Sequence, residues 1–396
     1  MSVEYKGKPY YVESDRLNLG NLGIQDISEI KGLENLIYLE KLDLYGNKIT
    51  EIKNLDNLTE LIGLYLGSNK ITEIKNLDNL TQLHTLILED NQITELKNLK
   101  SLTNLFRLRL ANNQINEIKN LEHLGKLTHL YLYNNQIMEI KNIENPYLKS
   151  LRLSGNKISE IKNLEELYRL EHLELSGNQI SEIKNLESLT QLQELALGSN
   201  KITEIKNLDN LTELKTLALS SSKISEIKNL ENLTQLKGLY LSRNYISEMK
   251  NLDELTQLEE LWLSFNKITE IKGLENLTQL KELILCYNQI TEIKNLDNLT
   301  QLEKLELHEN QISELKNLQN LTNLKSLNLL SNNIPEEMAR KSINTIIEYC
   351  RKKNDLVEEL ESITKQMESP GLELKDLQKL DQRVQKIIDE MKHYRQ

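Results

Sequence analysis

The chain has 396 residues, of which 28% are charged and 38% hydrophobic, and its formal net charge is -11 at pH 7. Since binding to a phosphate backbone needs clustered Lys and Arg, this acidic balance argues against nucleic acid as a partner. No run of about 18 apolar residues occurs, and Met1 to Asp15 lack the basic-then-apolar layout of a signal peptide, so we expect no membrane partner and a cytoplasmic protein.

Residues 1–16 are expected to form an N-terminal cap. A stack of repeats leaves the leucines of its end turns open to water unless another segment covers them. The first turn is degenerate, with Gly20 in a leucine place. A short hairpin over its edge could be built from Val3, Tyr5, Tyr10, Tyr11 and Val12.

Residues 17–334 repeat one pattern about 15 times, most often with a period of 22 residues. One copy reads Leu61, Leu64, Leu66, Asn69, Ile71, Ile74 and Leu77. The isoleucine two residues after the asparagine is constant from Ile27 to Ile334. The asparagine itself recurs at Asn47, Asn69, Asn91, Asn113, Asn135, Asn156, Asn178, Asn200, Asn244, Asn266, Asn288, Asn310 and Asn332, with Gln25 and Ser222 in two equivalent places.

The spacing has a physical reading. A Leu-x-Leu step has period two, so both leucines face one side of a short strand and the other residues face away. One turn cannot bury its leucines alone, but stacked copies build a parallel sheet over a continuous core. The asparagine amide can satisfy backbone groups where the strand ends. Because the side chain of Ser222 is shorter, its turn should be looser.

These residues resemble the leucine-rich-repeat family, and the 22-residue length is similar to the class that includes bacterial internalins and the leucine-rich regulator of type-1 protein phosphatase. The resemblance covers residues 17–335. It implies an α/β solenoid, a right-handed arc with a concave parallel β-sheet, whose concave side meets ligands. The chain departs from the internalins because we find no export signal, and from the phosphatase regulator because it carries a long charged helical tail.

The C-terminal part predicts helices. Residues 335–353 are expected to form a capping helix, with Asn333 as its cap, Pro335 in its first turn and Glu336 and Glu337 near its positive pole. Its apolar residues are Met338, Ala339, Ile343, Ile346, Ile347 and Cys350. Residues 354–396 show two further amphipathic runs, separated by Ser369, Pro370 and Gly371. They predict a helical hairpin, or a coiled coil that self-associates or docks a partner helix.

The sequence contains no recognisable catalytic motif. We find no phosphate-binding, metalloprotease or nucleophile-elbow motif, so we expect no enzyme and no cofactor. Cys286 and Cys350 lack disulfide or zinc spacing. His129 and His172 fall about 10 Å apart at the strand spacing, too far to share one metal ion, so no metal site is expected.

Glu and Lys recur two residues apart after the isoleucine, as in Glu51 and Lys53, and predict two charged ladders at a solvent edge.

A binding site should lie where the outward residues vary, because packing does not dictate them. One group is cationic and is named here the cationic patch: Arg107, Arg109, His129, Tyr131, Tyr133 and Arg152. The other, the aromatic patch, holds the only tryptophan: Tyr240, Arg243, Trp262, Phe265, Ile284 and Tyr287. Tyr, Trp and Arg dominate interface energetics. Between the patches in sequence lies a floor of small residues with room for an inserted segment: Ala196, Gly198, Ser199, Ala218, Ser220, Ser221 and Gly238.

We therefore expect a non-enzymatic interaction scaffold that binds a protein partner across both patches of the concave face. Three alternatives are regulation of a protein phosphatase, which the resemblance alone implies, a structural oligomer assembled through the C-terminal helices, and an extracellular adhesion protein. One repeat, between Asn135 and Asn156, is a residue shorter and contains Pro146, so a local change of curvature is expected there.

Overall fold

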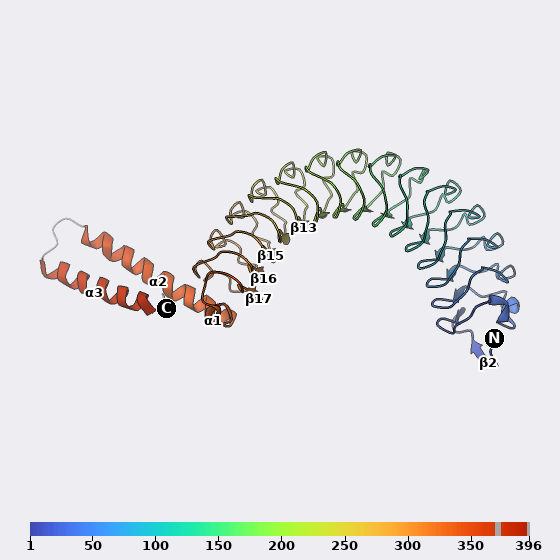
Figure 1. The fold of residues 1–396 in the computed structure, drawn as a ribbon, viewed down its shortest axis with the longest axis horizontal. Helices are drawn as coiled ribbons and strands as arrows, with labels where there is room; N and C mark the ends of the chain where they lie inside the picture. The colour runs from blue at the N-terminus through green and yellow to red at the C-terminus, as the bar shows by residue number, and fades with distance from the viewer. Residues whose placement is uncertain (369–373, 394–396) are drawn as a thin grey trace. The chain divides into compact units, whose positions relative to one another are not determined.

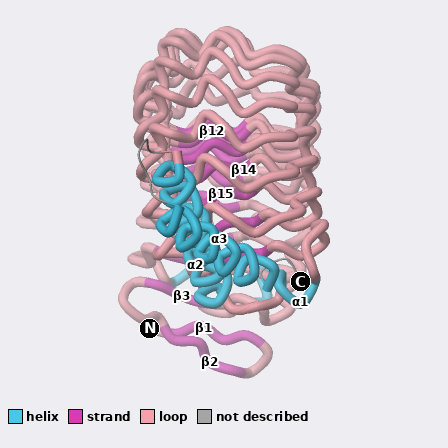
Figure 2. Tube along the Cα trace, turned by 90° about the vertical axis from the view of Figure 1, so that its left-hand side faces the viewer, coloured by secondary structure: helices cyan, strands magenta, loops and turns pink. Residues whose placement is uncertain are grey.

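The computed structural model describes residues 1–368 and 374–393, so the predicted break at Ser369, Pro370 and Gly371 lies outside the described residues. The chain divides into two units, Met1–Leu239 and Tyr240–Gln396, and each is described by itself. Both are built from stacked turns that each contribute one short strand to a parallel sheet (Figures 1 and 2).

The sheet has 15 strands, whose neighbours follow chain order. Each strand has three residues, and consecutive strands pair in register, as in Leu64 opposite Leu86. The strands are β3 (Arg16–Asn18), β4 (Lys41–Asp43), β5 (Gly63–Tyr65), β6 (Thr85–Ile87), β7 (Arg107–Arg109), β8 (His129–Tyr131), β9 (Ser150–Arg152), β10 (His172–Glu174), β11 (Glu194–Ala196), β12 (Thr216–Ala218), β13 (Gly238–Tyr240), β14 (Glu260–Trp262), β15 (Glu282–Ile284), β16 (Lys304–Glu306) and β17 (Ser326–Asn328). The predicted solenoid is confirmed.

The core consists of aliphatic columns that run from turn to turn. Leu61, Leu64, Leu66 and Ile71 are all 0% exposed, and their equivalents in the following turns are buried in the same way. Burying one such side chain stabilises the fold by about 1.5–3 kcal/mol, which is why a constant leucine or isoleucine recurs at each place. Within unit 1 the turns bend so that the strands line the inner side, which leaves one sheet face outside the core (Figure 1).

The recurring asparagine connects adjacent turns, as the sequence predicts. Asn69 accepts a hydrogen bond from the backbone N–H of Ile49 at 3.0 Å, and its amide donates to the carbonyls of Leu44 and Leu66, both at 3.0 Å. Ser222 is buried in the same column, but its hydroxyl has no hydrogen-bond partner. Its turn therefore lacks the side-chain bonds that the asparagine supplies elsewhere.

A second asparagine ladder was missed by the sequence analysis. Asn76 has a left-handed backbone (φ 57°) and donates from its side chain to the carbonyl of Ile52 at 2.7 Å. The same bond recurs from Asn98 to Ile74 and from Asn207 to Ile183. The signal was present in the sequence, because an asparagine precedes the next leucine in most turns, although Gly273 takes this place in one of them. This ladder pairs backbone carbonyls on the side of the turn opposite to the sheet.

The prediction for the first turn was wrong. Register places Leu17 of β3 opposite Leu42 of β4, a step of 25 residues. The buried isoleucine that corresponds to Ile49 is therefore Ile24, whose N–H donates to Asn47. Gln25 is exposed and does not replace the asparagine. Gly20 is not in a leucine place either, because the strand already supplies Leu17 and Leu19, both 0% exposed.

The first turn, which is longer than the others, contains two 3-10 segments, η1 (Ile27–Glu29) and η2 (Leu33–Asn35). The expected N-terminal hairpin is present as β1 (Ser2–Tyr5) and β2 (Lys8–Tyr11), an antiparallel pair. Glu4 bonds through its backbone to Lys31 in this turn. Of the predicted covering residues, Val3 and Tyr5 are buried, whereas Tyr11 is 65% exposed and contributes little cover.

The C-terminal helices differ from the prediction. The expected single capping helix is α1 (Glu336–Ala339) followed by α2 (Ile343–Met367), which runs past residue 353, the expected boundary. Asn333 is not the cap, because its amide donates to the carbonyl of Gln311, and Ser342 caps α2 by accepting from Thr345 N–H. A serine cap at the start of a second helix accepts a hydrogen bond from one of the first N–H groups of that helix, which have no partner within the helix.

α2 covers the last turns through its first half. Ile346, Ile347 and Cys350 are buried there, and burial raises the pKa of the Cys350 thiol to about 11. Lys353 pairs with Glu314 of the solenoid. α3 (Leu374–His393) packs on α2. No described helix is both long and apolar enough to cross a membrane.

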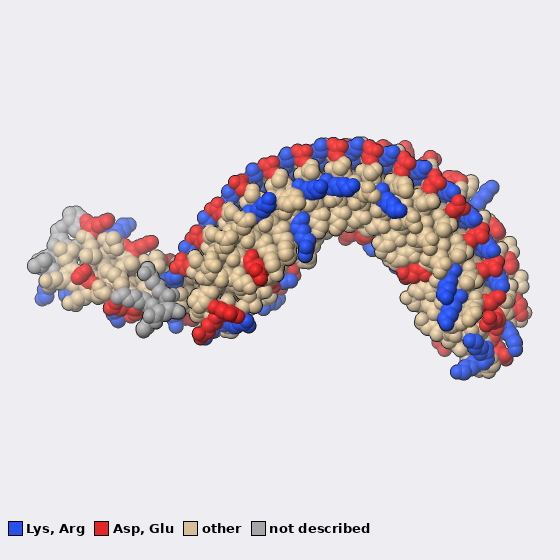
Figure 3. All heavy atoms as spheres, viewed as in Figure 1, with Lys and Arg blue, Asp and Glu red and all other residues tan. Residues whose placement is uncertain are grey.

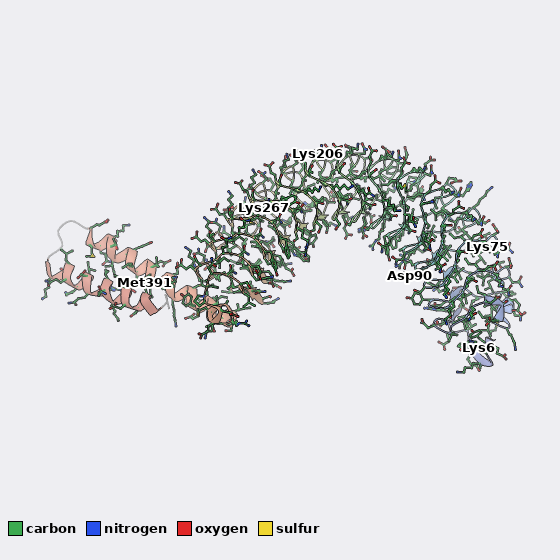
Figure 4. All side chains as sticks on the ribbon, in the orientation of Figure 1. Lys6, Lys75, Asp90, Lys206, Lys267 and Met391 are labelled. Atoms are coloured by element: carbon green, nitrogen blue, oxygen red, sulfur yellow. The ribbon has the colours of Figure 1, made fainter. Side chains whose placement is uncertain are left out.

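The Glu and Lys columns form a continuous ladder of ion pairs. Each lysine reaches back to the glutamate of the preceding turn, as Lys75 does to Glu51 at 2.7 Å. Lys97 contacts both Glu73 and Glu95, at 3.1 and 3.6 Å. The pairs line the rim away from the strands in alternating sign (Figure 3), and Lys75 and Lys206 are labelled on this rim in Figure 4. Exposed pairs of this kind contribute about 0–1 kcal/mol each.

Candidate protein-binding face

The outward sheet face is made by the first and third residues of each strand. The middle residue is a leucine that is buried in every strand except β17, where Leu327 is half-buried, so its two neighbours point away from the core. In unit 1 this rule places Arg107 and Arg109 on β7 and His129 and Tyr131 on β8, all half-buried. Tyr133 lies two residues after the end of β8, where the chain leaves the sheet. Asp90, at the corresponding edge, is labelled in Figure 4.

Tyr131 is the centre of the cationic patch. The guanidinium carbon of Arg109 lies 5.4 Å from the ring centroid, and that of Arg152 lies 4.8 Å from it. His129 meets the same ring edge-on at 6.2 Å. A cation over a tyrosine face gains about 0.5–2 kcal/mol, depending on desolvation. The structure thus brings four of the predicted residues together around one ring.

Two carboxylates that were not among the predicted site residues lie beside the arginines. Glu89 accepts from Arg109 Nε at 2.8 Å and from the Tyr133 hydroxyl at 3.4 Å. Glu174 forms an ion pair with Arg152, 3.3 Å from its Nε, but that Nε makes no hydrogen bond. Burial, followed by the charge of Glu89, raises the pKa of Tyr133. The patch is therefore ordered before any partner arrives, which lowers the entropic cost of binding.

The first strand residues form a separate row of the patch. Arg107, His129, Ser150 and His172 occupy equivalent places on four adjacent strands. His172 Nδ1 lies 2.8 Å from Glu194, and His129 Nδ1 lies 2.8 Å from the hydroxyl of Thr128. Burial and the nearby charge of Arg107 lower the pKa of His129. His172 was considered in the sequence analysis only as a metal ligand.

In unit 2, Tyr240 and Trp262 form the sheet-face half of the aromatic patch. Their rings meet edge-on, with centroids 4.8 Å apart, and Trp262 is 37% exposed. The Tyr240 hydroxyl donates to Glu260 at 2.7 Å, which fixes the ring. Ile284 is half-buried at the next equivalent place, and its backbone pairs with Trp262. A large exposed indole fixed by its neighbours is typical of an interface anchor.

The other half of the aromatic patch lies at the edge where the strands end. Arg243, Phe265 and Tyr287 occupy one place in three consecutive turns, and all three have a left-handed backbone, with φ 58°, 54° and 54°. Arg243 lies over the Phe265 ring at 4.3 Å, and Phe265 stacks on Tyr287 at 4.1 Å. These three residues were predicted on the sheet face, and they lie instead at the adjoining edge, where the left-handed backbone follows the strand.

His308, which was not among the predicted residues, extends the aromatic patch, because its ring meets Tyr287 edge-on at 5.5 Å. A separate contact joins Lys267 to Tyr245, with the lysine nitrogen 5.2 Å from the ring centroid of Tyr245, which is 52% exposed. Lys267 is labelled in Figure 4.

The floor of small residues is present in unit 1, but packing explains part of it. A Cβ on Gly198 would lie 2.9 Å from the Ser220 carbonyl oxygen of the next turn. The glycine is therefore required by the close approach of two backbones. Across the described residues no group of three or more His, Cys, Asp and Glu side chains could hold a metal ion.

Comparison with known proteins gives a family and a fold. The family model described as leucine-rich repeats in two copies matches residues 39–79, 59–101, 125–166, 146–188, 168–210 and 256–298. No match was found among curated proteins.

Several solved structures resemble the chain. The functional domain of InlJ from Listeria monocytogenes is 30% identical over 81% of this chain and 68% of its own, with a TM-score of 0.69. A leucine-rich-repeat protein of Leptospira interrogans is 28% identical over 84% and 94%, with a TM-score of 0.74. The ectodomain of the Arabidopsis receptor kinase GASSHO1/SCHENGEN3, solved with CASPARIAN STRIP INTEGRITY FACTOR 2, is 26% identical over 78% and 46%, with a TM-score of 0.52.

Proposed function

The chain belongs to the leucine-rich-repeat family, and from this membership we propose that it is a non-enzymatic scaffold that binds a protein partner. The contact surface is the outward sheet face with its adjoining edge, through the cationic patch in unit 1 and the aromatic patch in unit 2. The receptor ectodomain named above was solved with a factor bound, which supports a binding role for the fold. A fold alone does not name a function, so the residues must carry the proposal.

The observation that carries it is the choice of residue at the left-handed edge positions. A side chain with a Cβ pays about 1–2 kcal/mol for this backbone, and Gly, Asn and Asp pay least. Seven of the twelve equivalent places elsewhere follow that preference: Asn21, Gly46, Asp90, Asn112, Asn134, Gly155 and Gly177. The other five hold a small or acidic polar residue: Ser68, Ser199, Ser221, Glu309 and Ser331. Arg243, Phe265 and Tyr287 instead put an arginine and two aromatic rings at this place in three successive turns.

These three residues are not required by the core. Phe265 is 38% and Tyr287 41% exposed, and neither belongs to an aliphatic column. Side chains that cost folding energy, remain in water and stack on one another indicate a surface kept for contact. An exposed aromatic surface flanked by an arginine is the composition found in interface hot spots.

Affinity capture from native lysate, followed by measured dissociation constants for the captured partner, tests the proposal. We expect Trp262→Ala and Arg109→Ala each to weaken binding by about tenfold or more, because both remove an ordered anchor. Lys206→Ala, on the rim away from the strands, is the matched control and should leave binding unchanged. If neither patch variant weakens a confirmed partner, the proposal is wrong. Capture of a protein phosphatase would support the regulatory alternative.

A second candidate function is assembly through the C-terminal helices. α3 buries Ile387, but Ile388 beside it is 37% exposed and Leu377, Leu380 and Val384 are only half-buried. An amphipathic pair of helices with an incompletely covered stripe can be completed by a second copy. Mass measurement in solution for the wild type and Ile388→Glu tests this, with Lys386→Glu on the polar side as control. An unchanged monomeric mass in all three would exclude the oligomer.

For the compartment we propose the cytosol. Cys286 and Cys350 are both free and buried in the described structure. Buried reduced thiols suit a reducing compartment, where disulfides are rare. Fractionation of cells that express the tagged full chain tests this, and recovery of the chain from the medium or the cell envelope would contradict it.

A further inference from the structure

The first-row residues of the cationic patch include an arginine that the protein leaves unneutralised. Arg109 is paired with Glu89, and Arg152 with Glu174. Within the described residues Arg107 has no ion pair, and its Nε is buried without a hydrogen-bond partner. Its guanidinium carbon lies 5.9 Å from the Phe106 ring centroid. A buried unpaired donor carries a desolvation cost that a ligand oxygen would remove.

Ser150 is the second observation at this place. It is 2% exposed, and its hydroxyl has no hydrogen-bond partner. Register puts it directly between His129 and His172, on the strand second from Arg107. The spacing of adjacent strands is about 4.8 Å, so a group above Ser150 lies within reach of both imidazoles and of the long Arg107 side chain.

We infer that Arg107, His129, Ser150 and His172 form an oxyanion-binding site that receives a carboxylate side chain of an acidic segment of the partner. Arginine matches a carboxylate through two parallel N–H donors, and a hydroxyl and imidazole N–H groups supply the remaining bonds. His172 Nδ1 lies 2.8 Å from Glu194 but is buried without a hydrogen bond, so this imidazole also has unused hydrogen-bonding capacity. The inference rests on the proposed function, because it names the chemistry of the partner at one of the two patches.

The site should bind more tightly in mild acid. His129 is faced by Arg107, His172 and Lys149, which disfavour its charged form, and by Glu171, which favours it. Burial and these cations lower the pKa of His129, so charging its ring needs a lower pH than for an ordinary histidine. A carboxylate beside the ring offsets the cations and favours the protonated ring, and by linkage protonation favours the carboxylate.

Fluorescence anisotropy with the full chain and short labelled peptides tests the site. The probes are a hexaglutamate peptide, a hexalysine peptide and a phosphoserine peptide of equal length. We expect the hexaglutamate peptide to bind and the hexalysine peptide not to bind. Arg107→Gln and Ser150→Ala should each weaken binding of the glutamate peptide by about tenfold. Binding of this peptide to the wild type should be at least about threefold tighter at pH about 5.5 than at pH about 7.5. Lys201→Gln removes an exposed lysine of the same unit and should change the affinity less than about twofold.

The inference is wrong if Arg107→Gln and Lys201→Gln lose the same affinity, or if His129→Gln keeps the pH response of the wild type. It is also wrong if the phosphoserine peptide binds about tenfold more tightly than the glutamate peptide with the same dependence on Arg107, which would assign the site to phosphorylated partners. The proposed function fails separately, since it requires only that Trp262→Ala or Arg109→Ala weaken a captured partner. A partner sensitive to Trp262→Ala but not to Arg107→Gln removes the inference and keeps the scaffold.

Discussion

Phe265 and Tyr287 stack face to face, with centroids 4.1 Å apart and an angle of 8° between the rings, although each sits on a left-handed backbone. The stack returns about 0.5–1.5 kcal/mol, which is less than the cost of about 2–4 kcal/mol for the two backbone conformations. The pair therefore does not stabilise the fold, in contrast to the leucines beneath it. Selection for stability alone does not explain two aromatic rings at this edge.

We predict that Phe265→Asn and Tyr287→Asn change the free energy of unfolding by less than about 1 kcal/mol, because relief of the backbone offsets the lost stack. Urea denaturation measures this. Leu261→Ala, in the core of the same repeat, is the reference and should cost about 2–5 kcal/mol. Partner binding should fall with both Asn variants. A large loss of stability in Phe265→Asn would show that the ring is a structural element.

The missing member of the asparagine column gives a second prediction. Ser222→Asn should raise the free energy of unfolding by about 1 kcal/mol or more, because the new amide can accept from Ile202 N–H and donate to the Leu197 carbonyl. Asn200 makes the corresponding bonds one turn earlier, to Ile180 and Leu175. Thermal and urea unfolding of the variant measure the gain.

Two control variants accompany this substitution. Ser222→Ala removes the unpaired hydroxyl without adding an amide, so its effect should be small. Asn200→Ser creates a second gap in the ladder and should destabilise the protein by about 2–3 kcal/mol. If Ser222→Asn is no more stable than Ser222→Ala, the buried column does not depend on the amide bonds in the way described.

The interior of the repeats could be predicted from the sequence because packing imposes one residue type at each buried place. Ile71 has to match Ile49 and Ile93 above and below it, and all are 0% exposed. The first turn was predicted wrongly because it was assumed to have the same length as the later turns, whereas it is longer. The polar Gln25 was therefore assigned to the place of the asparagine, but the pairing of β3 with β4 shows that Leu17 is equivalent to Leu42.

The candidate site was predictable only in part. Alternation along the strand placed Tyr131 and Trp262 on the outward face, but nothing in that period tells which carboxylate an arginine will meet. Arg109 reaches Glu89, twenty positions earlier, because the two are brought together by stacking of turns. Arg243 and Phe265 were placed on the sheet face, since the left-handed backbone that turns them to the edge follows the strand and has no signature in residues of their type.

The second asparagine ladder should be as important for stability as the first. Asn207→Ala is expected to cost about 2 kcal/mol, because it leaves the Ile183 carbonyl unpaired and puts an alanine in a left-handed backbone. Asn207→Gly separates the two effects, since it loses the bond and keeps the conformation. Hydrogen exchange near residue 183 should rise in both. An Ala variant as stable as the wild type would contradict a structural role for this ladder.

Removal of the C-terminal cover should loosen the last turns before the rest. Ile346 is 2% exposed on the side of α2 that covers the solenoid. Ile346→Ala should destabilise this end by about 2–4 kcal/mol, and amide exchange should increase at residues 318–334 while residues in unit 1 stay protected. The matched control is Ile388→Ala on α3, a half-exposed place with little to lose. Uniform exchange along the chain would mean that the repeats unfold as one unit.

The charged end of the first turn gives a pH prediction. Asp26 accepts hydrogen bonds from Lys53 and from the hydroxyl and N–H of Ser28, which lower its pKa from 3.8 to about 2. A carboxyl with a lowered folded pKa contributes stability above its unfolded pKa, and that contribution is lost as the pH falls toward about 2. Because the side chain is 36% exposed, screening should keep the contribution below about 1 kcal/mol.

Asp26→Asn keeps an acceptor for Ser28 N–H and removes only the charge, so it isolates this contribution. The difference in unfolding free energy between wild type and variant should be constant from pH about 7 to about 5, and should disappear as the pH falls through the window from about 4 to about 2. Lys53→Met removes the main partner, and in an NMR titration it should return the Asp26 pKa toward its ordinary value. If the difference persists at pH about 2, the variant acts through the Ser28 cap, since a protonated Asp26 has no charge left to lose.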